Sequence, residues 1–144
     1  MANIKEINEN QAKLCFSLDS KTINLWSFVQ WEDTLKRKEV KSLGIYEGKR
    51  ILGVCVFHMI FEEAELLYLA IHPEFSRRGL GRALFENVLN ILKINHIKTI
   101  FVEVSSKNIP AINFYEIFDF KTINVRKKYY KDGSDAFLKA KLIF

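Results

Sequence analysis

A strand, an amphipathic helix and a second strand follow one another in the middle of the chain, and this order limits the fold most. Apolar residues recur every four positions at Leu80, Leu84, Val88 and Leu92, which predicts a helix with one buried face. The segment that follows, residues 99–104, is a nearly continuous run of β-branched and aromatic side chains, as expected of a buried strand. A strand on each side of the helix implies a parallel crossover.

Extended segments on either side of this crossover predict a larger sheet. They are rich in Val, Ile and Phe and are separated by turn signals, of which residues 47–50 and 131–134 are the clearest. The first three follow one another closely enough to form an antiparallel meander, and the last two should form a closing hairpin. Besides the strand at 99–104, the predicted strands span residues 42–46, 51–61, 65–71, 120–126 and 136–143.

Further helices are predicted before the meander and after the crossover. Residues 10–38 carry apolar side chains at helix-like spacing, which indicates one or two short helices. The central helix should end at Asn95, because Asn tolerates a left-handed conformation. Pro110 opens another helix, in which Tyr115 and Phe118 share a face, since Pro loses no hydrogen bond in a first turn. The chain is therefore predicted to be α+β, with a single mixed, mostly antiparallel sheet, a parallel central strand pair and helices on both faces.

Length and composition narrow the class of protein. The 144 residues fall within the usual size of one domain, so residues 1–144 are expected to fold as a single unit. Apolar stretches such as residues 51–60 are too short to cross about 30 Å of hydrocarbon, so no membrane partner is expected. The first residues show no secretory signal pattern, which favours the cytoplasm. Cys15 and Cys55 do not form a CxxC pair and are expected to be reduced thiols in the core.

The net charge and the spacing of the histidines argue against a nucleic-acid-binding protein and against a metal-binding protein. A formal net charge of +5 permits encounters with RNA but is modest for a dedicated nucleic-acid-binding protein, so no stable nucleic acid partner is expected. A basic module that binds ribosomal RNA through lysines and arginines within residues 121–131 is the alternative outside the enzymes. His58, His72 and His96 lack metal-ligand spacing, so no metal is predicted.

A glycine-containing loop connects the third predicted strand to the central helix. The first amides of a helix have no internal partners and point outward at its positive end, and glycine lets a phosphate approach the backbone closely. Arg77, Arg78 and Arg82 add positive charge. Gly79 and Gly81 by themselves would also fit an ordinary tight turn. The loop lacks the lysine of a P-loop and the third glycine of a dinucleotide fingerprint, so it matches neither nucleotide motif.

Two segments resemble motifs of the GNAT superfamily of acetyltransferases, and they occur in the correct order. Residues 76–81 are similar to its pyrophosphate loop, [QR]-x-x-G-x-[GA] after a β-strand, with Ser76 where the family has Gln or Arg. Residues 108–120 are similar to the pattern N-x-x-A-x-x-[FL]-Y-x-x-x-G-F, with Asp119 in place of the glycine. The resemblance covers about residues 53–140 and implies the GNAT fold with acetyl-CoA as co-substrate.

The same resemblance implies which residues bind acetyl-CoA. The loop and the first turn of the central helix would hold the pyrophosphate, while the strand before the loop would offer backbone hydrogen bonds to the pantetheine arm. Asn108, at the start of the second helix, would be a further contact. The residues assigned to acetyl-CoA are Leu69, Ala70, Ile71, Arg77, Arg78, Gly79, Leu80, Gly81, Arg82 and Asn108.

Two ionisable residues match the positions of the family's proton acceptor and donor. Glu103 is the only ionisable residue between Thr99 and Val104, and a carboxylate desolvated in such a strand is a stronger base, which suits a general base. The alternative is a carboxylate that faces outward or pairs with a lysine. Tyr115 would be the general acid that protonates the departing thiolate, and the alternative is a purely packing role.

Three further segments indicate which amine accepts the acetyl group. Residues 69–73, 101–104 and 126–136 resemble the ribosomal-protein-alanine N-acetyltransferases of the superfamily, which implies acetylation of the N-terminal α-amine of a ribosomal protein. Glu62, Glu63 and Glu65 would attract a basic peptide or form an ordinary solvated turn. A small-molecule amine or another protein amine is the alternative acceptor, because one fold hosts many substrates. The sequence contains no indication of the oligomeric state.

Overall fold

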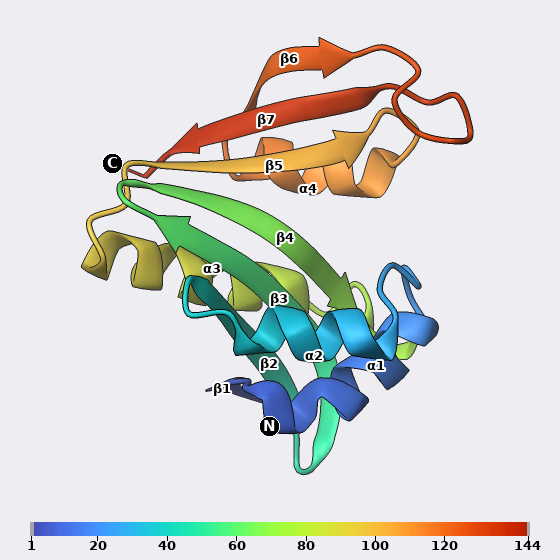
Figure 1. Cartoon of the computed structure of the whole chain (residues 1–144), viewed down its shortest axis with the longest axis vertical. Helices are drawn as coiled ribbons and strands as arrows, with labels where there is room; N and C mark the ends of the chain where they lie inside the picture. Colours follow the sequence, from blue (N-terminus) through green and yellow to red (C-terminus); the bar gives the residue numbers. More distant parts are fainter. Residues whose placement is uncertain (1, 144) are drawn as a thin grey trace.

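The computed structural model describes residues 2–143, and in this part of the chain seven strands form one sheet with the order β1-β2-β3-β4-β5-β7-β6 (Figure 1). Neighbouring strands are antiparallel except for β4 and β5, which are parallel. This confirms the predicted mixed sheet with its parallel central pair. The strands are β1 (Ala2–Glu6), β2 (Val40–Glu47), β3 (Arg50–Ile60), β4 (Glu63–Ile71), β5 (Thr99–Ser105), β6 (Lys121–Arg126) and β7 (Ala136–Leu142).

Helices cover both faces of this sheet, as predicted. The side chains of α3 pack with Tyr115 of α4 in one buried cluster, and those of α1 and α2 pack in a second cluster on the opposite face (Figure 1). Each cluster takes alternate residues of β3, because successive side chains of a strand point to opposite faces. The helices are α1 (Ala12–Ser20), α2 (Phe28–Lys36), α3 (Leu80–Ile94) and α4 (Ile109–Ile117), with 3-10 turns η1 (Glu9–Gln11) and η2 (Pro73–Phe75).

The central helix forms where its apolar spacing predicts it, but the left-handed residue after it lies one position later than predicted. Leu84, Val88 and Leu92 are fully buried against the sheet. Asn95 keeps a right-handed φ of −89°, and His96 takes the left-handed conformation with a φ of 59°. The prediction for Asn95 was wrong because both its backbone and its side-chain amide donate to the Ile91 carbonyl, which holds it in the last turn.

Strand β1, at one edge of the sheet, was not predicted from the sequence. Strand β1 pairs with β2 from Ala2–Glu47 to Glu6–Leu43, yet its sequence is short and mostly polar. An edge strand buries little of its surface, so it needs few apolar residues and leaves only a weak pattern. At the opposite edge, β6 is exposed along its whole length.

Strands β4 and β5 pair only over their first residues and then separate. Glu63–Glu65 pairs with Thr99–Phe101, after which β4 continues along β3 and β5 continues along β7. A register shift between Val56 and Phe57 leaves Leu67 as an extra residue in β4, and such a bulge bends and twists a strand. The result is a wedge between the C-terminal halves of the two strands, visible in Figure 1, which we call the strand opening.

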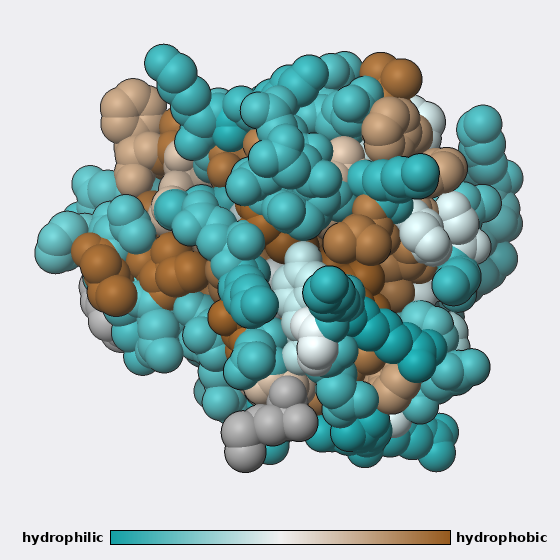
Figure 2. All heavy atoms as spheres, turned by 90° about the horizontal axis from the view of Figure 1, so that it is seen from below, coloured by the Kyte–Doolittle hydropathy of each residue, from teal (hydrophilic) through white to brown (hydrophobic). Residues whose placement is uncertain are grey.

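Figure 2 views the molecule from the end that carries β1 and the β2–β3 turn, and shows apolar side chains in separate groups among polar ones. Isolated apolar residues on a surface are ordinary. Within residues 2–143 no helix combines the length and the apolar character that a membrane crossing requires. Several of the exposed apolar side chains lie on or between α1 and α2: Leu14, Ile23, Leu25, Phe28 and Val29.

A fully buried carboxylate anchors α1 and α2 to the sheet. Asp19 Oδ1 accepts hydrogen bonds from the Leu25 amide at 3.0 Å and the Tyr68 hydroxyl at 3.0 Å. Its Oδ2 accepts from the Trp26 amide at 2.9 Å and the Trp31 indole at 3.0 Å. These donors come from the α1–α2 connection, from α2 and from β4, so one side chain ties three parts of the chain together.

Replacement of Asp19 by alanine should therefore destabilise the fold strongly. A buried donor left without an acceptor costs about 1–3 kcal/mol, and this variant leaves several donors without their acceptor. We expect the free energy of unfolding, measured with urea, to fall by at least about 3 kcal/mol. Asp33→Ala, which removes an exposed carboxylate from α2, is the matched control and should change it little. Equal stability of the two variants would contradict the anchoring role.

Candidate active site

A cavity of about 670 Å³ lies on the α3–α4 face of the sheet, beside the strand opening. Its walls come from the end of β4, the η2 loop, the first turn of α3 and the exposed side of α4. The fold thus brings together segments that are about 40 residues apart in the sequence. Nine residues predicted for the site line this first cavity: Leu69, Ala70, Ile71, Arg77, Gly79, Leu80, Gly81, Arg82 and Tyr115.

The N-terminus of α3 opens into the first cavity without a side-chain cap. Its N-cap is Gly79, with a left-handed φ of 76°, whereas Ser27 caps α2 and Asn108 caps α4 with side-chain hydrogen bonds. Arg77 also has a positive φ of 63°, and turns of this kind direct successive N–H groups into a concave anion site. The uncapped amides and the positive end of the helix dipole suit a phosphate group.

The predicted arginines divide into two kinds. Arg77 and Arg82 line the first cavity. Arg78 turns toward Glu47, with Nη2 3.9 Å from Oε2, and its guanidinium carbon lies 5.3 Å from the centre of the Phe75 ring. The structure therefore shows two arginines at the cavity and one occupied by contacts beside it. A direct role for Arg78 in anion binding stays a prediction.

Asn108 also has a contact of its own. Its Oδ1 accepts a hydrogen bond from the Ala111 amide at 3.3 Å, and the residue caps α4 rather than lining the first cavity. An Asn side chain at this position commonly satisfies the free amides of a helix start. Its predicted contact with coenzyme A is untested by this geometry.

Alternate residues of β4 direct their amide groups into the strand opening. The His72 amide donates to the Leu52 carbonyl at 2.7 Å, so His72 faces β3. By the alternation of a strand, Ala70 also faces β3, while Leu69 and Ile71 face the side that β5 has left. Their N–H and C=O groups therefore border the first cavity without the strand partner that would ordinarily bind them.

Tyr115 is both a core residue and a cavity residue. Its ring contacts Phe114 and Phe120, with centroids 5.5 and 5.2 Å apart, so the packing alternative holds for the ring. Burial, and to a smaller extent the nearby Cys55 thiol, raises the pKa of the Tyr115 hydroxyl. The hydroxyl thus keeps its proton across the neutral range and is available as a donor to whatever occupies the first cavity.

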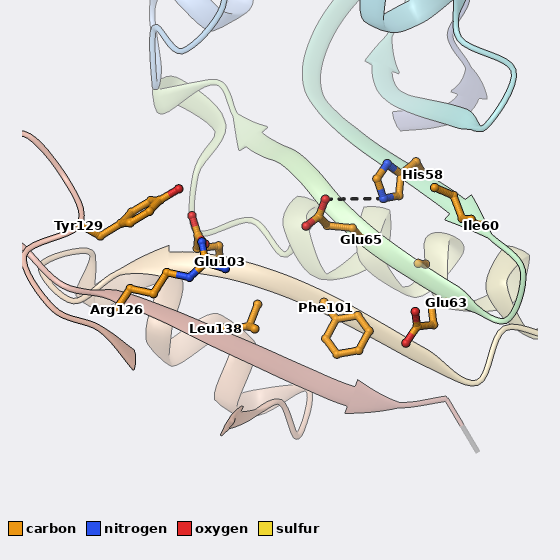
Figure 3. A pocket seen from close by; sticks show the side chains of 10 residues that line it. His58, Ile60, Glu63, Glu65, Phe101, Glu103, Arg126, Tyr129 and Leu138 are labelled. Carbon is orange, nitrogen blue, oxygen red and sulfur yellow. Dashed lines mark ion pairs between the residues drawn. The ribbon is translucent and has the colours of Figure 1, made fainter. Parts of the chain in front are cut away.

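Glu103 belongs to a second cavity, of about 600 Å³, on the opposite face of the sheet (Figure 3). Val102 and Val104 on either side of it are buried with α3, so Glu103 points the other way. Its Oε2 lies 3.4 Å from Arg126 Nη1. The expected isolation of this carboxylate was therefore wrong, and its partner is an arginine rather than a lysine. The ion pair could not be foreseen because β7 separates β6 from β5 in the sheet.

Further charged groups share the second cavity. Glu65 lies 3.5 Å from His58 across the β3–β4 pair, and Glu63 lines the same space (Figure 3). With Glu103, these carboxylates outnumber the arginine and favour a cationic guest. Glu63, Glu65 and His58 were all noted in the sequence, but the pairing of His58 with Glu65 was not predicted. Within residues 2–143 no group of three or more His, Cys, Asp or Glu side chains is arranged to hold a metal ion.

The two residues predicted for catalysis approach the strand opening from opposite faces. Tyr115 lines the first cavity and Glu103 lines the second, with β5 and the wedge between them. A reactant that binds along the first cavity and one that enters from the second could therefore meet in the opening. The geometry suits a transfer between two substrates better than the binding of a single ligand.

Comparisons with known proteins bear on this arrangement. A family model described as "Acetyltransferase (GNAT) family" matches residues 7–120. The [ribosomal protein bS18]-alanine N-acetyltransferase of Salmonella typhimurium is 35% identical over 89 residues, which are 62% of this chain and 60% of that protein. The chain thus spans less than two thirds of the length of this curated relative.

Solved structures show the same fold. The ribosomal-protein-S18-alanine N-acetyltransferase from Escherichia coli superposes with a TM-score of 0.93, covering 99% of this chain and 94% of that one at 24% identity. NAA60 of Arabidopsis thaliana in complex with acetyl-CoA superposes with a TM-score of 0.87, covering 99% of both chains at 13% identity. At these identities the likeness confirms the predicted fold.

A glycine exchange tests whether the α3 loop binds a diphosphate. Gly79→Ala forces alanine into a left-handed conformation, which costs about 1–2 kcal/mol and distorts the anion site. We expect the affinity for coenzyme A, measured by calorimetry, to fall about tenfold or more. Gly48→Ala is the matched control, because Gly48 has a φ of 62° and equally open surroundings in the β2–β3 turn. An equal loss of affinity in both variants would assign the effect to general destabilisation.

Proposed function

We propose that this chain, which belongs to the acetyltransferase (GNAT) family, transfers the acetyl group of acetyl-CoA to the N-terminal α-amine of a ribosomal protein that begins with alanine. One observation carries the proposal. An uncapped helix start and Tyr115 line a cavity on one face of the sheet, and Glu103 lines a cavity on the other face, beside the two strands that separate after Glu65 and Phe101. The named relative from Salmonella typhimurium supports the choice of acceptor. Such a reaction would take place in the cytoplasm, where ribosomal proteins are made.

The first cavity fits acetyl-CoA. The uncapped start of α3, with Arg77 and Arg82 beside it, would hold the diphosphate. The amide groups of Leu69 and Ile71 would bind the pantetheine arm as a missing strand would. This substrate supplies the activated acetyl group, and the end of its arm would then lie beside Tyr115 in the strand opening.

Glu103 and Tyr115 would divide the proton transfers. Glu103 would take a proton from the acceptor ammonium on the second-cavity side, which frees the nitrogen lone pair. As the new C–N bond forms and the C–S bond breaks, Tyr115 would donate its proton to the departing thiolate. The raised pKa of Tyr115 keeps that proton in place until the sulfur needs it. The nitrogen loses a second proton as the amide forms, and this proton returns to the Tyr115 phenolate by way of solvent. The proton held by Glu103 then passes to solvent, so both residues are restored and the reaction releases one proton in all.

The energetics favour an α-amine over a lysine side chain as acceptor. At pH 7 an α-amine with a pKa near 8 costs about 1.4 kcal/mol to deprotonate, whereas a lysine near 10.4 costs about 4.6 kcal/mol. A single carboxylate that is itself paired with Arg126 is adequate for the first task. The carboxylates of the second cavity would also attract the positive charge of a basic peptide.

An acceptor panel tests this proposal. The purified chain is incubated with acetyl-CoA and an alanine-starting basic peptide, the same peptide blocked at its N-terminus but containing lysine, and small amines such as a polyamine. We expect mass spectrometry to locate the acetyl group on the α-amine of the alanine. Exclusive modification of small amines or lysine would reject the acceptor while leaving the acetyltransferase assignment standing.

Substitutions test the two proton-transfer roles. Glu103→Gln and Tyr115→Phe should each lower kcat about 10²- to 10⁴-fold, the usual contribution of acid–base catalysis, with little change in the affinity for acetyl-CoA. Glu86→Gln on the exposed side of α3 and Tyr46→Phe on β2 are the matched controls, since neither residue lines the first or the second cavity. Turnover close to that of the unaltered chain in both test variants would disprove the assignment.

A further inference from the structure

Arg126 reaches Glu103 across an intervening strand. Strand β7 lies between β6 and β5, and the register aligns Arg126 with Ala136 and Ala136 with Ser105. Aligned residues of neighbouring strands share a face, so Arg126 stands on the Glu103 side of the sheet. The small side chain of Ala136 lets the long arginine side chain lie over β7. Its Nη1 then comes to 3.4 Å from Glu103 Oε2.

A tyrosine supports the guanidinium from the segment that follows β6. The Arg126 guanidinium carbon lies 5.4 Å from the centre of the Tyr129 ring, within cation–π range. Tyr130 follows in the same segment, and burial and next the charge of Glu103 raise the pKa of its hydroxyl. The guanidinium that lies against Glu103 is thus held between this carboxylate and an aromatic ring of its own segment.

The remaining charged groups of the second cavity do not replace this arginine. Glu63 and Glu65 come from β4 and are negative, and His58 of β3 is the partner of Glu65 at 3.5 Å. Figure 3 shows Arg126 beside Glu103, with the His58–Glu65 pair on the neighbouring strands. Arg126 is therefore the positively charged side chain that lies against the Glu103 carboxylate in this cavity.

The ion pair between Arg126 and Glu103 contributes little to the stability of the fold. The side chains of Arg126 and Glu103 are 50% and 29% exposed, and pairs of this kind contribute little because water and salt screen them. Its consequence is local, since it orients the one carboxylate that lines the acceptor side of β5.

We infer that Arg126 is a positioning residue that holds the Glu103 carboxylate, in its ionised form, toward the acceptor amine. The role rests on the proposed function, because it presupposes that Glu103 accepts a proton. When the ammonium enters, it meets a carboxylate already oriented by Arg126. After proton transfer the neutral Glu103 no longer attracts the guanidinium, and loss of that proton to solvent restores the pair.

A double-mutant cycle tests the inference on the full chain, with kcat and KM measured for an alanine-starting peptide. Arg126→Gln should lower kcat about 10- to 100-fold, as expected when a catalytic group loses its geometry, and leave KM for acetyl-CoA unchanged. Added to Glu103→Gln, the same substitution should have no further effect. Arg126→Lys, which keeps the charge but loses the planar fork, should recover part of kcat.

Three outcomes would overturn the inference. One is an unaltered kcat in Arg126→Gln, and another is a further loss of kcat in the Glu103→Gln background, which would place the arginine elsewhere. The third is a change confined to KM for the peptide, which would make Arg126 a binding residue. Lys41→Gln removes an exposed cross-strand pair with Glu6, at 3.3 Å, and is the control for loss of a surface cation. Absence of any acetyl transfer by the unaltered chain would instead reject the proposed function itself.

Discussion

The separation of β4 from β5 is the constraint on which the candidate site depends. Two parallel strands that begin as neighbours would ordinarily bind each other along their whole length, and the hydrogen-bonding groups of Leu69 and Ile71 would then be occupied. The bulge at Leu67 bends β4 away from β5, and β5 instead pairs along its length with its antiparallel partner β7. The wedge that results is a place where a ligand can act as the missing strand, between two cavities on opposite faces of the sheet.

The two faces differ in charge in a way that matches two reactants. On the α3–α4 face, an uncapped helix start and the arginines Arg77 and Arg82 make the surroundings positive. On the other face, glutamates dominate the second cavity, and Arg126 is paired with one of them. The positive face attracts an anionic reactant and the negative face attracts a cationic one, so the two reactants reach the strand opening from opposite faces. The buried Asp19 holds the helices of the second face in place.

Local patterns account for the parts of the fold that the sequence predicted. Helix α3 and strand β5 follow from the spacing of their own apolar residues, and Pro110 and the glycine loop mark the starts of helices. Strand β1 was missed because it buries too little to leave a pattern. The left-handed residue after α3 was misplaced because it depends on the amide contacts of Asn95. Both errors lie where local preference is weak.

From residue 40 onward, the sequence by itself determined the succession of strands and helices along the chain, the glycine loop before α3 and the presence of Glu103 and Tyr115 in segments that resemble an acetyltransferase. These are properties of neighbouring residues, which the periodicity of strands and helices encodes directly. Only the tertiary structure decided that Glu103 pairs with Arg126, that Arg78 turns to Glu47, and that the two predicted catalytic residues approach from opposite faces. Such contacts depend on strand order and register, because β7 enters between β5 and β6 from the end of the chain.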